Sequence, residues 1–273
     1  MSTPVVFCVV PVHNRAEVTA QFLRCAMQQT YPKIEIIVVD DGSTDGTSEL
    51  LGGLNCPNLT VLKGNGSLWW AGAMRLAMEH VLTIAAAGDY LLMINDDVHI
   101  KPDYVELLVA ESSRTTRTIV GSLQCDRTTE IPMVSGYKID YWQVRIIPLD
   151  PRSVLADALP GRGTLFPVAA VRACGLVRSR VFEHYLADLE YTARAKEAGW
   201  KLVICHKARV YTSSISSDFA VRRKGLAHRY FSNRSKDNLI IRLLFFAMRG
   251  PLILRLTALP RFGIMGAIRI LGK

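Results

Sequence analysis

The sequence predicts an α/β protein with a mostly parallel sheet flanked by helices. Short runs of β-branched apolar residues, which fit buried strands, alternate with stretches that place apolar residues on one helical face. Polar and acidic residues follow most of the apolar runs, as they do where the strands of such sheets end near a ligand. The chain has 273 residues, of which 49% are hydrophobic, so it can form the core of one large domain or two small ones.

The first half of the chain, residues 1–122, carries the clearest alternation. The predicted strands are Pro4–Pro11, Lys33–Asp40, Leu59–Leu62 and Tyr90–Asn95. The predicted helices are Ala16–Gln29, Ser48–Leu54, Trp69–Ala87 and Pro102–Ser112. This β-α-β order favours parallel strands with helices on both faces of the sheet.

After Ser122 the pattern changes. Residues 134–147 alternate loosely between apolar and polar and predict hairpins, and Pro167–Cys174 predicts a short helix. A further helix is expected over Asp188–Gly199, with Asp188 at its N-cap and the glycine just past its end. Lys201–Cys205 predicts a last strand.

The net charge of +9 is unevenly distributed. Residues 222–273 contain twelve Lys or Arg and one acidic residue, Asp237, which leaves 21 basic and 23 acidic residues in 1–221. In this C-terminal segment arginines interrupt apolar runs, and none of the runs reaches the roughly 18–20 residues that a spanning helix needs. The pattern favours helices at an anionic membrane surface. The alternatives are a helical pair packed on the body and a homodimer interface, whereas nucleic acid is not an expected partner.

The six cysteines are scattered and show no CxxC pair, which predicts buried free thiols in a reducing cytoplasm. The N-terminus lacks a basic region followed by an apolar one, so no signal peptide is expected.

Four polar segments follow predicted strands and should meet at one edge of the sheet. Asp96 and Asp97 are adjacent and should point in opposite directions, so that one faces a ligand and the other the scaffold. A divalent cation bound to a diphosphate takes one or two protein carboxylates, although a solvated turn is the alternative. The DDGSTD turn offers carboxylates to a base or ribose, or is only a polar turn. The four segments are VHNR (12–15), DDGSTD (40–45), GNGSLWWAG (64–72) and NDD (95–97).

Taken together and in order, these motifs resemble those of the inverting family 2 glycosyltransferases, which have the GT-A fold. The four motifs occur in the same order as in that family, over roughly residues 4–212. They are PVHNR, VVDDGSTDGT, NDD and DLEYTARAKEAG. The resemblance implies a GT-A domain over 1–221, with a nucleotide-binding half (1–122) and an acceptor half (123–221), followed by the segment 222–273. It implies transfer of a sugar, with inversion, from a nucleotide-diphosphate donor to an acceptor hydroxyl.

The resemblance also assigns roles to individual residues. Asp97 would bind Mg²⁺ or Mn²⁺, and Asp188 would be the general base, with an ordinary helix cap as the alternative for Asp188 and Glu190 as the fallback base. The helix dipole is expected to keep Asp188 ionised. At least one of Trp69 and Trp70 would contact the donor, unless both are core residues. The predicted donor-binding residues are Pro11, Val12, Asn14, Arg15, Asp40, Asp41, Gly66, Trp70, Arg75 and Asp96.

Two positions depart from the family pattern. Thr212 stands where many relatives carry a metal-binding His, and His206 lies out of register, so it is expected to be structural or on the surface. Ala187 precedes the base where relatives often carry Glu. These departures leave open how strongly a metal is held.

The resemblance implies a cytoplasmic enzyme, peripheral on the inner face of the cell membrane. Its donor would be a UDP- or dTDP-sugar, and its acceptor a lipid-linked or growing glycan of bacterial surface polysaccharide. A late segment with Tyr230, Asn233 and Arg234 resembles bacterial rhamnosyltransferases. The alternative is a non-catalytic GT-A-like module that binds nucleotide or glycolipid at the membrane.

Overall fold

A computed structural model describes residues 3–213, 238–261 and 263. Its centre is an eight-stranded sheet with the order β3-β2-β1-β4-β9-β6-β10-β5. The strands are β1 (Val6–Val12), β2 (Ile34–Asp40), β3 (Leu59–Lys63), β4 (Tyr90–Met93), β5 (Val98–Ile100), β6 (Thr118–Asp126), β9 (Thr164–Pro167) and β10 (Lys201–Thr212). The predicted α/β class is confirmed.

The sheet is parallel in its N-terminal half and mixed beyond it. β3, β2, β1 and β4 run parallel, as the alternating pattern predicts. β9 then lies antiparallel between β4 and β6, and β5 pairs antiparallel with β10. β5, β6 and β9 were not among the predicted strands, and β10 extends well past Cys205.

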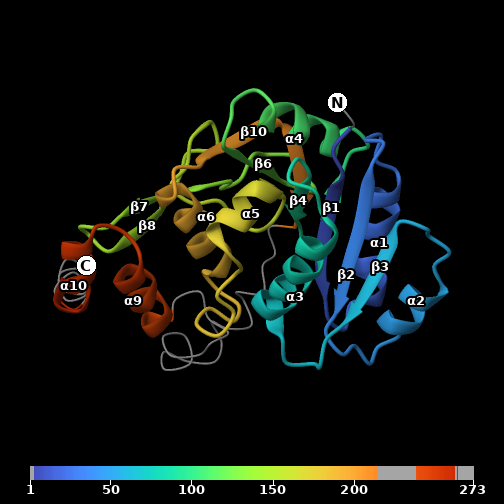
Figure 1. Ribbon diagram of the computed structural model, residues 1–273, viewed down its shortest axis with the longest axis horizontal. Helices are drawn as coiled ribbons and strands as arrows, with labels where there is room; N and C mark the ends of the chain where they lie inside the picture. Colours follow the sequence, from blue (N-terminus) through green and yellow to red (C-terminus); the bar gives the residue numbers. More distant parts are fainter. Residues whose placement is uncertain (1–2, 214–237, 262, 264–273) are drawn as a thin grey trace.

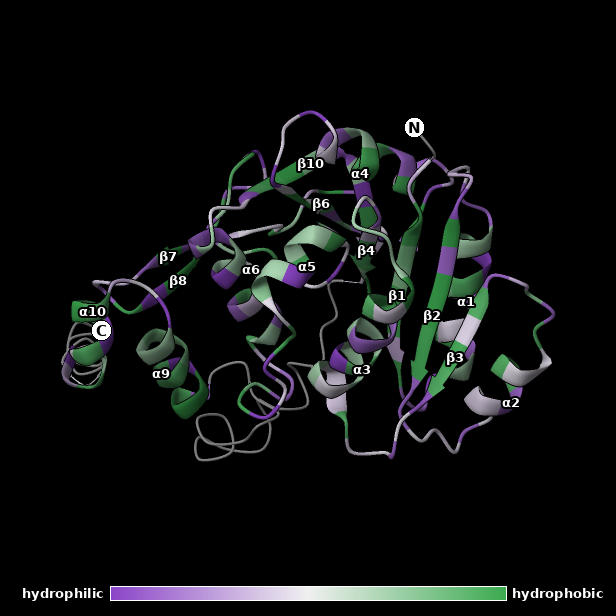
Figure 2. Cartoon of the chain, viewed as in Figure 1, coloured by the Kyte–Doolittle hydropathy of each residue, from purple (hydrophilic) through white to green (hydrophobic). Residues whose placement is uncertain are grey.

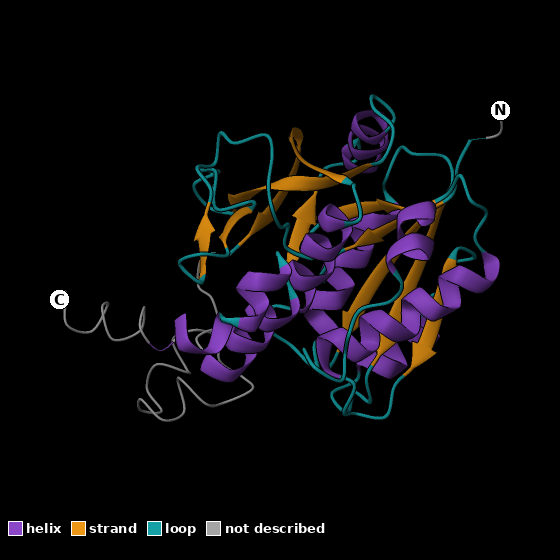
Figure 3. Cartoon of the chain, turned by 60° about the vertical axis from the view of Figure 1, so that its left-hand side comes forward, coloured by secondary structure: helices purple, strands orange, loops and turns teal. Residues whose placement is uncertain are grey.

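Helices cover both faces of the sheet, as Figures 1 and 3 show. Buried residues of α3, α5 and α6 share one hydrophobic cluster with one face, and those of α1, α2 and α4 share a second cluster with the other. The helices are α1 (Ala16–Met27), α2 (Thr47–Gly53), α3 (Trp69–Ile84), α4 (Tyr104–Ser112), α5 (Val168–Cys174) and α6 (Ala187–Glu197). The helices cover the faces of the sheet but not the carboxyl ends of β1, β2 and β4, where a ligand could bind.

Residues 134–147 contain the expected hairpin, in which β7 (Tyr137–Asp140) pairs with β8 (Arg145–Pro148) as a separate two-stranded sheet. All six cysteines are free, but only Cys8, Cys125 and Cys205 are buried. The other three are half-buried, so the expectation of buried thiols is correct for half of them.

The C-terminal helix α9 (Leu239–Met248) packs against the body of the protein, and the short helix α10 (Leu252–Leu256) contacts α9. Phe245 and Phe246 are buried in the cluster that contains α3 and α6, and Arg249 forms an ion pair of 2.9 Å with Glu197. Helices α9 and α10 consist largely of hydrophobic residues, as their colouring in Figure 2 shows, and several of these side chains are exposed. The exposed fractions are 69% for Leu252, 71% for Ile253, 76% for Leu256 and 68% for Leu259.

None of the helices within the described residues is both long enough and apolar enough to span a bilayer. The predicted boundary between residues 221 and 222 lies outside the described residues, as do Tyr230, Asn233 and Arg234.

Candidate active site

The four predicted segments meet at the carboxyl ends of the parallel strands. Each segment contacts at least one of the others through side chains, so the expected convergence is confirmed. The joining contacts are Asn14 Oδ1 with Thr44 N (2.7 Å), Asp41 Oδ1 with Gly66 N (2.8 Å), Trp70 Nε1 with Asn95 Oδ1 (2.9 Å) and Arg15 Nη1 with Asp96 Oδ1 (3.0 Å).

Asp41 fixes the loop that leads into α3. Its Oδ1 accepts the N–H of Gly66, and its Oδ2 accepts the N–H groups of Leu68 (2.9 Å) and Trp69 (3.0 Å). A side chain on Gly64 would lie 2.5 Å from Asp41 Oδ1, so the loop approaches the carboxylate closely. Asp41 therefore binds backbone groups at the helix start, and its predicted contact with base or ribose stays a prediction.

Asp40 and Asn14 shape the neighbouring turn. Asp40 is buried, but hydrogen bonds from Ser43 and Ser48 outweigh the effect of burial and hold the pKa of its carboxyl below the ordinary value. Asn14 has a left-handed φ of 51° and accepts the N–H of Thr44. Pro11 and Val12 end β1, and the Val12 carbonyl accepts the N–H of Asp41 at 3.0 Å.

Asp96 faces the scaffold beneath the site. Its Oδ1 pairs with Arg15 Nη1 at 3.0 Å, and Thr19 Oγ1 donates to its Oδ2 at 3.0 Å. Burial raises the pKa of Asp96 to about 6, against the opposing effects of Arg15 and Thr19. Asp96 is thus the buried partner of the adjacent pair, in agreement with the expectation that one carboxylate faces inward, and its predicted contact with the donor stays a prediction.

Asp97 is the more open carboxylate, with 32% of its side chain exposed. Its Oδ2 lies 3.5 Å from Arg162 Nη2 and 4.0 Å from Arg15 Nη2. Its Oδ1 is buried and has no hydrogen-bond partner among the described residues. A carboxylate oxygen without a donor fits a hard divalent cation, which prefers oxygen ligands. No group of three metal-binding side chains occurs within the described residues, so the remaining ligands would be water and the diphosphate.

Asp188 lies in the first turn of α6, which begins at Ala187. The prediction of Asp188 as N-cap is wrong, because Leu186 is the N-cap and has a left-handed φ of 63°. Asp188 Oδ2 accepts the N–H of Gly161 and its Oδ1 accepts the N–H of Leu189, both at 2.8 Å. Burial nevertheless raises the pKa of Asp188. Desolvation therefore exceeds the effect of the N–H donors, and the expectation that the helix dipole keeps Asp188 ionised stays a prediction.

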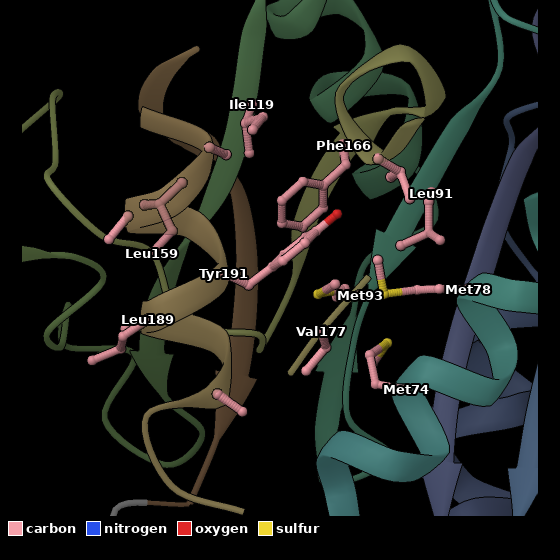
Figure 4. Packing of buried hydrophobic residues seen from close by; sticks show 14 of the residues in the cluster. Met74, Met78, Leu91, Met93, Ile119, Leu159, Phe166, Val177, Leu189 and Tyr191 are labelled. Carbon is pink, nitrogen blue, oxygen red and sulfur yellow. The ribbon is translucent and has the colours of Figure 1, made fainter. Parts of the chain in front are cut away.

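Core packing fixes the position of α6 behind Asp188. Tyr191, one turn along the helix, packs against Phe166 of β9 with ring centroids 5.3 Å apart. Figure 4 shows these two rings between α6 and the methionines of α3. This contact joins the helix that carries Asp188 to β9 of the sheet.

The tryptophans have different environments. Trp69 is 39% exposed and approaches His184 edge-on, whereas Trp70 is half-buried and donates to Asn95. A side chain on Gly161 would lie 2.5 Å from Trp70 Cζ2 and 3.2 Å from Asp188 Cβ. Trp70 therefore packs directly against the loop that holds the predicted base.

Asp97 and Asp188 are connected through two adjacent residues of one loop. The N–H of Gly161 binds Asp188, and the guanidinium of the next residue, Arg162, pairs with Asp97. The charge of Arg162 also lowers the pKa of Asp188, in opposition to burial. Two adjacent residues thus join the predicted metal ligand to the predicted base.

Two residues named from the sequence lie apart from these contacts. Arg75 pairs with Glu79 at 3.0 Å on the surface of α3 and donates to the Val177 carbonyl. Glu190 is fully buried and faces Arg178 and Arg194, as well as Arg249, away from Asp188. Glu190 is therefore not placed to act as the fallback base.

The family profile described as glycosyl transferase family 2 matches residues 7–159, which is more than half of the chain. The chain belongs to this glycosyltransferase family. Glycosyltransferase AglE of Haloferax volcanii is 47% identical over 232 residues, which cover 80% of this chain and 72% of that protein. Chondroitin synthase of Pasteurella multocida is 32% identical over 111 residues, 40% of this chain. The chain spans only 11% of that synthase.

Solved structures place this family 2 glycosyltransferase in the GT-A fold. The mannosyltransferase PcManGT of Pyrobaculum calidifontis, solved with GDP-Man and Mn²⁺, has a TM-score of 0.67 at 17% identity. The alignment covers 100% of this chain and 77% of that chain.

Three further residues, which were not predicted from the sequence, contact the predicted site residues. They are Thr19, Gly161 and Arg162. They lie in a helix and a loop that carry none of the four motifs, so only their contacts reveal them. Thr212, where relatives often carry His, donates to the backbone carbonyl of Asp97 at 3.4 Å. His206 contacts the Ser153 carbonyl at 2.9 Å, in keeping with its expected structural role.

Proposed function

We propose that the chain is an inverting glycosyltransferase that moves a sugar from a nucleotide-diphosphate donor to an acceptor hydroxyl. The observation that carries the proposal is the link between Asp97 and Asp188 through Gly161 and Arg162. It supplies a carboxylate for the leaving-group side of the sugar and another for the acceptor side, as inversion requires. PcManGT, a structure of the same fold, holds GDP-Man and Mn²⁺, which supports a nucleotide-sugar donor.

In this mechanism Asp188 accepts the proton of the attacking hydroxyl. Its raised pKa makes it a stronger base than an ordinary aspartate, while the two N–H donors fix the orientation of the carboxylate. Asp97 would hold Mg²⁺ or Mn²⁺ with its unpartnered Oδ1. When bound there, the cation would neutralise the charge that develops on the leaving diphosphate.

The nucleotide is proposed to lie over the carboxyl ends of β1 and β2. This region is bordered by Pro11, Val12, Asn14 and Arg15. Asp40 and Asn14 accept backbone N–H groups of Ser43 and Thr44 and so fix the conformation of the 41–45 turn. Gly66 and Trp70 would face the diphosphate and sugar. The proposed donors are UDP- and dTDP-sugars, including dTDP-rhamnose. The proposed acceptor is a lipid-linked or growing glycan of bacterial surface polysaccharide.

The deciding experiment compares wild type with Asp188→Asn in a transfer assay with UDP-, dTDP- and GDP-sugars. The variant should bind nucleoside diphosphate with unchanged affinity but lose transfer by about two to four orders of magnitude, because the base is absent. Asp103→Asn, at an exposed position, is the control and should keep full activity. Full activity of Asp188→Asn would refute the assignment. Nucleotide binding without any turnover by wild type would favour the non-catalytic module.

We also propose that the outer surface of α9 and α10 contacts an anionic membrane, which would bring a lipid-linked acceptor to a site on the inner face of the cell membrane. The support is the row of exposed Leu252, Ile253, Leu256 and Leu259. Arg255 and Arg261 donate to backbone carbonyls, so the apolar side chains rather than these arginines would provide most of the contact. Leu252→Asp combined with Leu256→Asp should abolish co-sedimentation with anionic liposomes. Unchanged co-sedimentation would exclude this surface, and a shift from dimer to monomer would identify a homodimer interface instead.

A further inference from the structure

The loop that carries Arg162 is held rigidly on both sides of that residue. The N–H of Gly161 binds Asp188, and the N–H of Gly163 binds the Met93 carbonyl at 2.9 Å. Gly163 has a φ of +87° and lies directly against Tyr104, so only glycine fits there. The backbone of Arg162 is therefore fixed at the end of β4, and only its side chain can change partner.

The guanidinium of Arg162 is poorly satisfied in this arrangement. Its contact with Asp97 Oδ2 is long, at 3.5 Å, and its Nε is buried without a partner among the described residues. The Nε of Arg194 also lacks a partner among the described residues, but its Nη1 and Nη2 donate to the Cys174 and Leu176 carbonyls at 2.7 and 2.8 Å. Because a guanidinium has five N–H donors in a planar fork, Arg162 retains donors for an anionic group with several oxygens.

Arg162 and a divalent cation compete for the same carboxylate. Both are positive, and a cation bound to Asp97 would repel a guanidinium 3.5 Å from Oδ2 of that residue. The repulsion is relieved when an anionic group becomes the new partner of the guanidinium. Arg15 is less able to move, because it pairs with the buried Asp96 at 3.0 Å.

We propose that Arg162 couples the binding of metal to the binding of the donor diphosphate. In the free protein Arg162 neutralises Asp97 and disfavours the metal on its own. When nucleoside diphosphate is present, the guanidinium pairs with phosphate oxygens and leaves Asp97 to the cation. Each ligand then increases the affinity for the other by the same factor. This inference rests on the proposed function and identifies Arg162 as a donor-binding residue.

The test measures Mn²⁺ binding to the full chain by electron paramagnetic resonance, with and without UDP, dTDP or GDP. For wild type, the best of these nucleotides should tighten Mn²⁺ binding about tenfold or more. Arg162→Gln should bind Mn²⁺ alone more tightly than wild type and should show clearly weaker coupling, of which the part due to direct coordination of the cation by the diphosphate remains. Arg162→Lys keeps the positive charge and should therefore keep part of the coupling between Mn²⁺ and nucleotide.

The control is Arg152→Gln, because Arg152 is 92% exposed and pairs only with Asp150 among the described residues. This variant should behave as wild type. Equal coupling in wild type and Arg162→Gln would overturn the inference while leaving the proposed function intact. If none of the nucleotides affects Mn²⁺ binding by wild type, the proposed donor site itself is wrong. Circular dichroism spectra of the variants establish that they are folded.

Discussion

The pKa values of the buried Asp96 and the half-buried Asp188 are both raised above the ordinary value, yet their partners differ. Asp96 is paired with Arg15, whereas Asp188 is bound by two backbone N–H groups. The first arrangement neutralises a buried charge, and the second orients the carboxylate that we propose as the base. Backbone strain accompanies both, since Asn14 and Leu186, next to Arg15 and Ala187, have φ values of 51° and 63°. Such left-handed residues cost about 1 kcal/mol or more each and are typical of functional sites.

Asp96 should make the stability of the folded protein depend on pH. Its pKa rises from 3.8 to about 6 on folding, so between these values the folded state binds more protons than the unfolded state. The free energy of unfolding should therefore fall as pH rises from about 4 to about 6, by about 2–3 kcal/mol, and then remain level. Asp96→Asn lacks this titration.

The measurement is urea denaturation of wild type and Asp96→Asn at pH 4 and pH 7. Wild type should lose about 2–3 kcal/mol relative to the variant between the two values. The control variant Asp103→Asn, at an exposed position, should have the same free energy of unfolding as wild type at both pH values. A difference between wild type and Asp96→Asn that is independent of pH would contradict the assignment.

At the scale of elements, the site depends on one short loop between the hairpin and β9. Residues 160–164 touch α3 through Trp70, α6 through Asp188 and β4 through Met93. A loop with contacts to three elements transmits a displacement of any one of them to the others. The loop therefore sets the relative position of the two predicted catalytic carboxylates.

Gly161→Ala should disturb this loop. The added Cβ would lie 2.5 Å from Trp70 Cζ2 and 3.2 Å from Asp188 Cβ, so the indole or the base must move. We expect the transfer rate to fall about tenfold to hundredfold and the free energy of unfolding to fall by about 1–3 kcal/mol. The control is Gly52→Ala in α2, where an added Cβ meets nothing within 4 Å. Transfer kinetics and urea denaturation give both quantities. Unchanged kinetics would show that the loop tolerates a shift and does not position the base.

In the molecule as a whole, residues 238–261 pack against the rest of the protein with some side chains and expose others to solvent. Phe245 and Phe246 extend the hydrophobic core, and Arg249 meets the buried Glu190 of α6 at 3.6 Å. The helix that carries the predicted base is therefore also the helix on which α9 docks.

Phe245→Ala should destabilise the entire protein. Phe245 is fully buried, so the substitution removes core contacts and leaves a cavity, at a cost of about 3–5 kcal/mol. Leu256→Ala is the matched control, because Leu256 is 76% exposed and should change stability by less than about 0.5 kcal/mol. Urea denaturation followed by far-UV circular dichroism gives both values. If the midpoint for Phe245→Ala equals that of wild type, α9 does not contribute to the core.

The parallel half of the sheet, its covering helices and the meeting of four polar segments could all be predicted from the order of the residues. These features follow from local periodicity and from the rule that parallel strands end at one edge, so distant contacts are not needed. The antiparallel position of β9 beside β4, the binding of backbone by Asp41, and the connection of Asp97 to Asp188 through Gly161 and Arg162 became known from the folded protein alone. The raised pKa of Asp188 became known in the same way. Burial and contacts between residues far apart in the chain produce these properties, and neither is encoded in a local pattern of residues.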